Sequence, residues 1–412
     1  MDDDDASHAD DASGAEAGSQ TEARIDARRE AVPAEPGGES RADALGRVRV
    51  VDFSRILAGP FATMILADLG AEVTKVERPG SGDETRAWGP PWDDRGEATY
   101  FEAVNRNKRS IALDLRDPAG LAAARELVAA ADVLVENFRP GVMDRLGLGW
   151  EDAAALNPRL IYCSISGFGS GAGAGLPGYD LLLQALGGLM SITGEPDGEP
   201  QKVGVALVDV LAALFATTGI LAALHHRDAG GGRGQRVEID LLTSLLAALV
   251  NQGSAYTIAG AVPGRLGNAH PSIAPYELLA TAEGELVLAV GNERQFSDLC
   301  AVIGRPGLAG DERFATNALR VEARSELRAE LEAALAGRPA RDWAEELTAR
   351  GVPAGTVNDV AAAFALAEEL GLEPIVAVPR GDGYATRLTR NPIGLSATPV
   401  SYRSPPPPRP DA

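Results

Sequence analysis

Short apolar runs of β type alternate with stretches of helical pattern along residues 48 to 166, and this alternation predicts successive β–α–β units. Asp117-Pro118 is typical of a helix start, because Asp can cap the first turn and Pro has the backbone angle that the first helical position requires. The predicted helices are Pro60 to Leu69 and Pro118 to Ala130. The predicted strands are Val48 to Phe53, Ala71 to Val76, Ser110 to Leu115, Asp132 to Asn137 and Leu160 to Ser166.

This alternation implies a parallel sheet with helices on both faces, which is a Rossmann-like α/β fold. In such sheets the reactive groups lie beyond the carboxyl ends of the strands. The sequence places polar segments there, namely Ser54-Arg55, Glu77-Arg78, Glu136 to Arg139 and Ser166 to Phe168.

The second half of the chain predicts helices at Tyr179 to Leu189 and Val210 to Leu224, a strand at Gln235 to Ile239 and a long helix from Asp240 to about Ile258. After this helix the pattern of predicted strands and helices changes, which predicts a smaller α/β domain. We therefore expect four parts: an acidic tail over 1–40, a large domain over 41–261, the small domain over 262–350, and a return to the large domain with a proline-rich end over 351–412.

The formal charge of −21 argues against a nucleic-acid partner, since a protein that follows phosphates needs a net basic face. Residues 1–40 hold 12 acidic and 3 basic side chains and few large apolar ones. Such a segment buries too little surface to offset its ordering entropy, so we expect a disordered, solubilising extension. The chain as a whole is 45% hydrophobic, which is typical of a globular protein.

The cysteine and histidine content points to a reducing, cytoplasmic setting without a metal. Cys163 and Cys300 lie far apart in apolar contexts, which predicts buried thiols. The four histidines have no metal-ligand spacing; they are His8, His225, His226 and His270. We see no export signal or membrane anchor in the pattern, so no membrane partner is expected.

Gly204 to Asp209 places one carboxylate after an apolar run and directly before the helix predicted at Val210. A partly desolvated carboxylate at a helix amino end stays ionised and reactive, so Asp209 is a candidate nucleophile. The competing interpretation is a simple helix N-cap, which is the commoner role of Asp at such a position.

Several cations lie at or just after the predicted strand ends and could converge on a polyanionic ligand, although a solvated basic rim is the alternative. They are Arg78, Lys108, Arg109, Arg116, Arg139 and Arg145. Phe138 beside Asn137 could receive a purine ring. A dinucleotide site fits poorly, because the turn from Phe53 to Pro60 has no GxGxxG pattern.

Six segments together resemble the successive signatures of the class III coenzyme A transferases, the family of formyl-CoA transferase and the carnitine CoA-transferases. The resemblance runs from about residue 45 to about 403 in the family's order. Its segments are Val50 to Pro60, Asp68 to Pro79, Asn105 to Ile111, Val135 to Gly141, Pro177 to Asp180 and Gly234 to Ile239.

The resemblance implies that Asp209 attacks an acyl-CoA thioester and then carries CoA as an aspartyl thioester. It also implies an interlocked homodimer and no permanently bound cofactor, with the CoA thioester as substrate. CoA contacts fall on Ile56, Arg78, Leu113, Arg116, Asn137, Phe138 and Arg145. The reacting end falls on Trp88, Tyr179 and Asp180.

Two further segments, Gly188 to Gly194 and Arg265 to Tyr276, resemble the branch of succinyl-CoA:glutarate and other dicarboxylate CoA-transferases. A distal carboxylate needs a cation, which Arg265 or His270 could provide. His270 could equally cap a loop. Leu57 stands where formyl-CoA transferase has its active-site glutamine, so the resemblance does not favour oxalate or formate.

Two other functions fit the same fold. An α-methylacyl-CoA racemase needs a proton carrier on each side of the α-carbon, and Tyr179 stands where the racemase has its histidine. A non-catalytic CoA-binding protein is the third possibility, which the presence of Asp209 disfavours.

Overall fold

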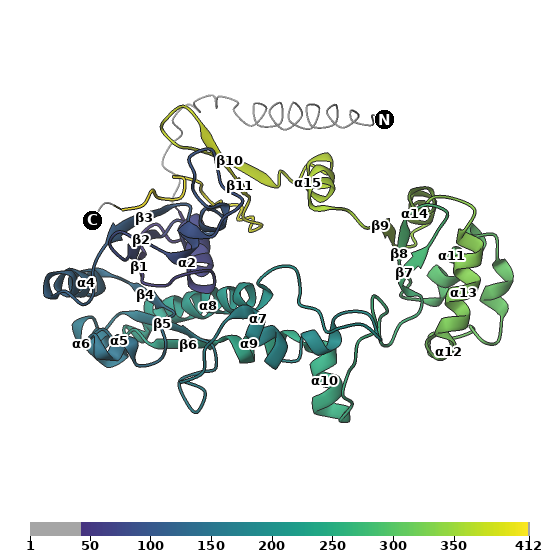
Figure 1. Cartoon of the computed structure of the whole chain (residues 1–412), viewed down its shortest axis with the longest axis horizontal. Helices are drawn as coiled ribbons and strands as arrows, with labels where there is room; N and C mark the ends of the chain where they lie inside the picture. The colour runs from purple at the N-terminus through teal and green to yellow at the C-terminus, as the bar shows by residue number, and fades with distance from the viewer. Residues whose placement is uncertain (1–42, 411–412) are drawn as a thin grey trace, which may run out of the picture. The chain divides into compact units, whose positions relative to one another are not determined.

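The computed structural model describes residues 43–410, which form two compact units (Figure 1). The first unit comprises the described parts of Met1–Gly178, Asp209–Ser244 and Glu373–Ala412. The second comprises Tyr179–Val208 and Leu245–Leu372. The acidic tail expected over 1–40 lies outside the described residues.

The first unit is built on a six-stranded sheet in which all neighbouring strands run parallel, in the order β3-β2-β1-β4-β5-β6. The prediction of a parallel α/β sheet is confirmed, and each predicted strand of this sheet overlaps an observed one. The order reverses between β1 and β4, and such a reversal leaves a crevice at the strands' carboxyl ends. The strands are β1 (Arg49–Asp52), β2 (Glu72–Glu77), β3 (Lys108–Ala112), β4 (Val133–Glu136), β5 (Ile161–Ser166) and β6 (Arg236–Asp240).

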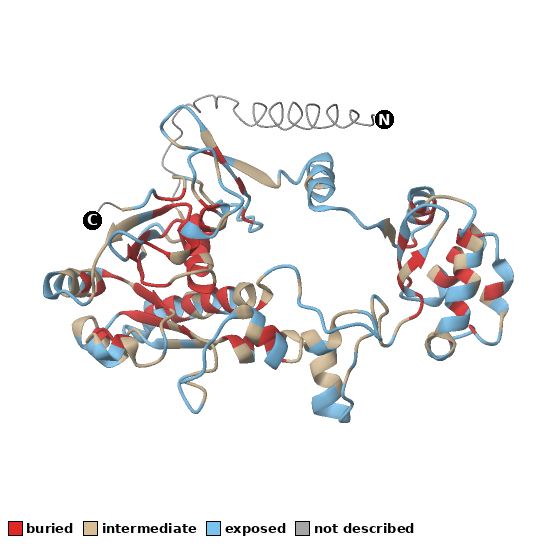
Figure 2. Cartoon of the chain, viewed as in Figure 1, coloured by how far each residue is buried: buried red, intermediate tan, exposed pale blue. Residues whose placement is uncertain are grey.

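Helices cover both faces of this sheet, because alternate strand residues point to opposite sides. Val51 and Leu134 face a core shared with Val128, on the side of α4 (Pro118–Ala130), α5 (Val142–Arg145) and α6 (Trp150–Leu156). The opposite face meets α2 (Ala58–Asp68), which packs on β1, β2 and β4. Figure 2 shows the buried residues concentrated along the strands and α2.

Helix α8 (Leu207–His226) lies on the same side as α2, where Gly219 closely approaches Val237 of β6. The segment Leu207–Gly231 is long and apolar enough, by length and composition, to cross a membrane. Its residues Val208, Ala212 and Ile220 are fully buried, however, and the core helix of a globular protein passes the same test. We therefore interpret α8 as a core helix.

The start of α8 differs from the sequence-based prediction. The helix begins at Leu207 rather than Val210, so Asp209 lies in its first turn and is not the residue before the helix. Asp180, at the start of α7 (Asp180–Leu186), accepts a 2.8 Å hydrogen bond from the Val208 N–H. A cap supplied from a distant segment satisfies a first-turn donor, so no local capping residue signals this helix start.

The second unit has its own core around a three-stranded antiparallel sheet. Leu279, Leu286, Phe296, Leu331 and Trp343 belong to this core. The sheet consists of β7 (Tyr276–Ala280), β8 (Glu285–Ala289) and β9 (Ala354–Thr356). Its main helices are α11 (Glu293–Val302), α12 (Asn317–Glu322), α13 (Arg324–Leu335) and α14 (Ala340–Ala349).

The chain does not pass between the two units at residues 261 and 350, where the sequence analysis placed the domain boundaries. Strand β9 still pairs with β8, and the first unit resumes at Glu373. The long helix expected from 240 to about 258 is two helices, because Val250 has a φ of 41°, which a continuous helix does not allow. The domain boundaries that we predicted from the sequence remain a proposal.

The remaining elements are short. The helices are α3 (Thr99–Glu102), α9 (Leu241–Ala248), α10 (Val250–Ala259) and α15 (Val360–Glu369), and the strands β10 (Ile375–Pro379) and β11 (Ala385–Thr389) form an antiparallel hairpin. Single helical turns of other types lie at Glu84–Ala87, Met190–Ile192, Arg227–Gly231 and Pro306–Gly310.

Replacing Asp117 with Ala should lower the free energy of unfolding of the first unit by about 1 kcal/mol. The Asp117 carboxylate accepts hydrogen bonds of 3.0 and 3.1 Å from the N–H groups of Ala119 and Gly120, and Ala leaves both donors without this partner. Urea denaturation measures the change. Asp152→Ala, in the first turn of α6 without a side-chain cap bond, is the control and should change stability by less than about 0.5 kcal/mol. Equal losses in both variants would contradict the capping role.

Candidate active site

A pocket of about 620 Å³ opens at the carboxyl ends of β1 to β4, beside the point where the strand order reverses. It lies where nucleotide-like ligands bind in open α/β sheets. Five residues expected at a CoA site line this pocket together: Arg78, Leu113, Arg116, Phe138 and Arg145. The structure therefore assembles these side chains, although they are spread over 68 positions of the sequence.

The other two expected residues, Ile56 and Asn137, are not among those that line the pocket but lie next to Arg55 and Phe138, which do. The Asn137 side chain accepts from the Arg55 N–H at 2.8 Å and donates to the Arg55 carbonyl oxygen at 2.7 Å. Ile56 has a φ of 69°, and its N–H points to Asp83. Both residues thus shape the turn between β1 and α2.

The charges of the pocket favour an anionic ligand. The side chains of Arg78 and Arg116 are 60% and 86% exposed, and their ion pairs with Glu84 at 3.6 Å and Asp114 at 3.1 Å are open to solvent. Two acidic groups of the lining are buried in ion pairs, Glu77 with Arg86 at 2.8 Å and Asp83 with Lys75 at 2.9 Å. Exposed guanidinium groups over a partly apolar floor suit phosphate groups.

Sequence reasoning missed Arg55 as a member of this site. Its guanidinium carbon lies 4.8 Å from the centre of the Phe138 ring, and Arg55 lines the same pocket. A planar cation over an aromatic ring provides a stacking surface for a base. No sequence pattern singles out Arg55, because the contact joins two strand ends that are 83 residues apart.

The expectation that Lys108 reaches a polyanion is wrong. Its ammonium is fully buried, where it donates to the Pro60 carbonyl oxygen at 2.8 Å and to Asn105 at 2.9 Å and pairs with Asp52 at 3.2 Å. Burial lowers the pKa of Lys108 to about 8, and the repulsion from the neighbouring Lys75 adds to this effect while Asp52 opposes it. Lys108 points into the sheet's α2 side because its strand residue faces that way.

The prediction that Arg139 converges with the other cations on one ligand is also wrong. It lines a separate pocket of about 490 Å³ with Glu136, Tyr162 and Arg236, on the other side of β4. Burial raises the pKa of Glu136 to about 6, so this pocket contains a carboxyl that is easily protonated. The two pockets are distinct, and the cations of the strand ends do not converge on one point.

Asp209 is half-buried in the first turn of α8. At this position the partial positive charge of the helix amino end stabilises a carboxylate. An ionised carboxylate oxygen is the kind of group that acts as a nucleophile in acyl transfer. Trp88, expected at the reacting end, is 42% exposed and packs edge to face on Tyr100 with 5.4 Å between ring centres.

The second unit carries the other expected residues. Tyr179 is 61% exposed at the start of α7, and Asp180 caps α8 through Val208 as described above. The Arg265 guanidinium donates to the carbonyl oxygens of Glu195 at 3.0 Å and Gly198 at 2.8 Å. Arg265 therefore holds the loop that follows Gly194.

His270 has the geometry of the loop-capping alternative. Its Nδ1 accepts a 3.0 Å hydrogen bond from the Ser272 N–H, and its ring packs on Tyr276 at 5.2 Å between centres. An imidazole nitrogen that accepts from an amide is unprotonated. In this arrangement His270 holds the turn to Ser272.

The thiols do not compete as nucleophiles. Cys163 and Cys300 are both buried, and burial raises the pKa of Cys300 to about 11 and that of Cys163 further above its ordinary range. A thiol in such a setting is unreactive. Within residues 43–410, no three His, Cys, Asp or Glu side chains are grouped so that they could hold a metal ion.

Comparison with known proteins identifies the family. The model of CoA-transferase family III matches residues 45–411. The chain belongs to this family. The resemblance seen in the sequence motifs is therefore confirmed, and the protein is a CoA-transferase whose substrates include a CoA thioester.

Individual relatives of this CoA-transferase are similar over most of their length. A succinate–glutarate CoA-transferase of Agrobacterium fabrum is 44% identical over 374 residues, which cover 89% of this chain and 93% of the relative. An acetyl-CoA:oxalate CoA-transferase of Acetobacter aceti is 43% identical over 336 residues, 81% of this chain and 84% of the relative. The crystal structure of a CAIB/BAIF family protein from Brucella suis is 43% identical and has a TM-score of 0.79, covering 89% of this chain and 96% of that one.

Proposed function

We propose that this CoA-transferase moves CoA from succinyl-CoA to a dicarboxylic acid such as glutarate, through an aspartyl-CoA thioester on Asp209. One arrangement carries the proposal: a cation-lined pocket at the β1–β4 reversal and, in the same unit, a carboxylate in the first turn of α8. The succinate–glutarate relative supports the choice of substrates. The enzyme needs no resident cofactor for this chemistry.

The proposed reaction is a series of acyl transfers in which every bond is accounted for. An Asp209 oxygen attacks the thioester carbon, the C–S bond breaks, and CoA thiolate leaves a mixed anhydride. The thiolate then attacks the Asp209 carbonyl carbon, which releases succinate and forms the aspartyl thioester. The acceptor carboxylate repeats these two steps in reverse order, and Asp209 is regenerated without net proton transfer.

We propose Arg265 as the cation that holds the acceptor's distal carboxylate. Its bonds go to backbone carbonyl oxygens, and among the described residues no carboxylate pairs with it. No carboxylate among the described residues therefore neutralises the positive charge of the Arg265 guanidinium. His270 is the weaker candidate, because its Nδ1 accepts an amide hydrogen bond.

The relatives argue against the racemase alternative, since those from Agrobacterium fabrum and Acetobacter aceti have CoA-transferase names. Both thiols are buried and unpaired, which supports a reducing, cytoplasmic location. The net charge of −21 gives no support to a nucleic-acid partner.

We also propose that the enzyme is a homodimer with interlocked chains. Helix α15 has ten residues, none of them buried, and Val360 is 76% exposed. Helix α10 likewise buries no residue, and Ile258 at its end is 84% exposed. Helices this short are marginal in water unless they pack, so these apolar surfaces need a cover, which a second copy of the chain would provide.

Asp209→Ala should abolish CoA transfer while the dissociation constant for CoA changes by less than about threefold, because the covalent step has no substitute but the pocket is intact. Mass spectrometry after mixing the native enzyme with succinyl-CoA should find a CoA or succinyl adduct on the peptide that contains Asp209. An adduct on Cys163 or Cys300 would refute the mechanism.

Arg265→Met should raise the Michaelis constant for glutarate roughly ten- to a hundredfold, since a charge-assisted hydrogen bond is lost. The rate with acetate, however slow, should stay nearly constant. Initial-rate assays with succinyl-CoA and glutarate, oxalate or acetate test this. Arg294→Met, which removes an 87% exposed arginine of the same unit, is the control. Equal losses with mono- and dicarboxylates would assign Arg265 to the loop it holds.

Sedimentation should give a mass of twice 42.8 kDa. Interlocked chains cannot separate without unfolding, so mixing folded tagged and untagged enzyme should yield no hybrid dimers, whereas joint refolding should yield them. A monomer mass would contradict dimerisation, and rapid exchange between folded dimers would contradict interlocking.

A further inference from the structure

The turn from β1 to α2 is held in a conformation that its own sequence disfavours. Ile56 has a φ of 69°, in the left-handed region that a β-branched residue rarely adopts. Such a residue costs on the order of 1–3 kcal/mol and persists only where its surroundings enforce it. The turn matters for the site because Arg55 lines the pocket and lies over Phe138.

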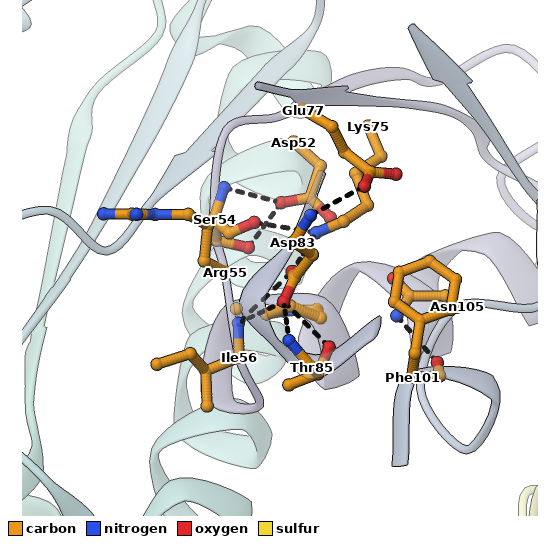
Figure 3. A network of polar contacts seen from close by, with 12 residues as sticks. Asp52, Ser54, Arg55, Ile56, Lys75, Glu77, Asp83, Thr85, Phe101 and Asn105 are labelled. Carbon is orange, nitrogen blue, oxygen red and sulfur yellow. Dashed lines mark hydrogen bonds and ion pairs between the residues drawn. The ribbon is translucent and has the colours of Figure 1, made fainter. Parts of the chain in front are cut away.

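Side chains form hydrogen bonds with successive backbone groups of this turn (Figure 3). The Ser54 N–H donates to Asp52 at 2.9 Å, and the Ser54 carbonyl oxygen accepts from the Lys75 ammonium at 2.8 Å. Asn137 binds both polar groups of the Arg55 backbone, as described above. The Ile56 N–H lies 3.3 Å from Asp83 Oδ2. The turn is thus fixed by its side-chain partners rather than by secondary structure.

Lys75 links Ser54 and Asp83, which lie at the two ends of this set of contacts. Its ammonium contacts the Ser54 carbonyl oxygen and also pairs with Asp83 at 2.9 Å, and both side chains of the pair are fully buried. Lys75 stands directly opposite Asp52 in the register of β1 and β2. Figure 3 shows the Lys75 side chain extending from β2 beneath the turn toward both partners.

The ammonium stays charged despite its burial. Desolvation disfavours the charged form, but Asp52 and Asp83 outweigh it, so the pKa of Lys75 lies above its ordinary value. The same cation holds the pKa of Asp83 below its ordinary value against the opposing effect of burial. A buried ion pair adds little to stability compared with a well-packed apolar pair of the same size. Its presence here points to a role in fixing geometry.

We propose that Lys75 is a positioning residue for the acyl-CoA site: through Ser54 and Asp83 it sets the turn that places Arg55 against Phe138. This inference rests on the proposed CoA site and extends it to a fully buried side chain in the wall of the pocket. Without the ammonium, the Ser54 carbonyl and Asp83 lose their common partner, and Ile56 relaxes toward a more ordinary backbone conformation.

The test compares Lys75→Met with the double variant Lys75→Met/Asp83→Asn, which leaves no unpaired buried carboxylate at Asp83. Lys75→Met should raise both the Michaelis constant for succinyl-CoA and the dissociation constant of CoA, measured by calorimetry, by roughly tenfold or more. Turnover at saturating succinyl-CoA should fall less than threefold, since Asp209 is unchanged. The double variant should recover much of the lost thermal stability but not the affinity for CoA.

Arg106→Met is the matched control. Arg106 pairs with Asp68 at 2.6 Å, with 3% and 0% of the side chains exposed, in the same unit as Lys75. It contacts no backbone group of the turn. This variant should lower the melting temperature comparably to Lys75→Met and leave the dissociation constant of CoA within twofold.

Three outcomes would overturn the proposal: recovery of CoA affinity together with stability in the double variant, an equal loss of affinity in Arg106→Met, or failure of both Lys75 variants to fold. The test does not depend on turnover. A native enzyme that binds CoA but transfers nothing would refute the proposed function, while the comparison of CoA affinities would still decide the role of Lys75.

Discussion

The ion pair between Lys75 and Asp83 lies beneath the turn that leads from the first strand of the sheet to α2. Charges that are fully buried must be paired, because an isolated ion in the protein interior costs several kcal/mol. This requirement links the last residue of β1 to the middle of β2 and to the loop that follows β2. Contacts with these three segments fix the backbone conformation of the turn. This turn positions Arg55, which lines the pocket.

The same principle separates the two lysines of this region. Lys75 is surrounded by carboxylates and keeps its charge, whereas Lys108 has one direct carboxylate partner, Asp52, and a cationic neighbour, so its pKa falls to about 8. Each still has hydrogen-bond acceptors for its ammonium protons. A dense buried charge network beside a ligand pocket can fix backbone geometry more narrowly than apolar packing, since its hydrogen bonds have defined directions.

A second constraint concerns the nucleophile proposed on α8. The amino end of this helix is capped by Asp180 from a separate segment, and Asp209 lies in the first turn of the helix rather than ahead of it. Asp180 thus accepts the hydrogen bond from the Val208 N–H. The helix end can then stabilise the Asp209 carboxylate electrostatically, which suits a group that must remain ionised.

The sequence by itself determined the alternating strands and helices, the helix start at Asp117-Pro118 and the family motifs, because these depend on local periodicity, on capping and on short runs of residues. It also placed Arg78, Arg116 and Phe138 after strands, and these three residues line one pocket because parallel strands bring their carboxyl ends to one edge of the sheet.

Only the tertiary structure decided where each cation points. Lys108 turned inward and Arg139 joined a separate pocket, because side-chain direction follows strand register and the opposite faces of the sheet. Arg55 gained its place over Phe138, and α8 its early start at Leu207, through partners more than twenty residues away. Contacts of this kind depend on which segments the fold brings together, and no local pattern in the sequence contains that information.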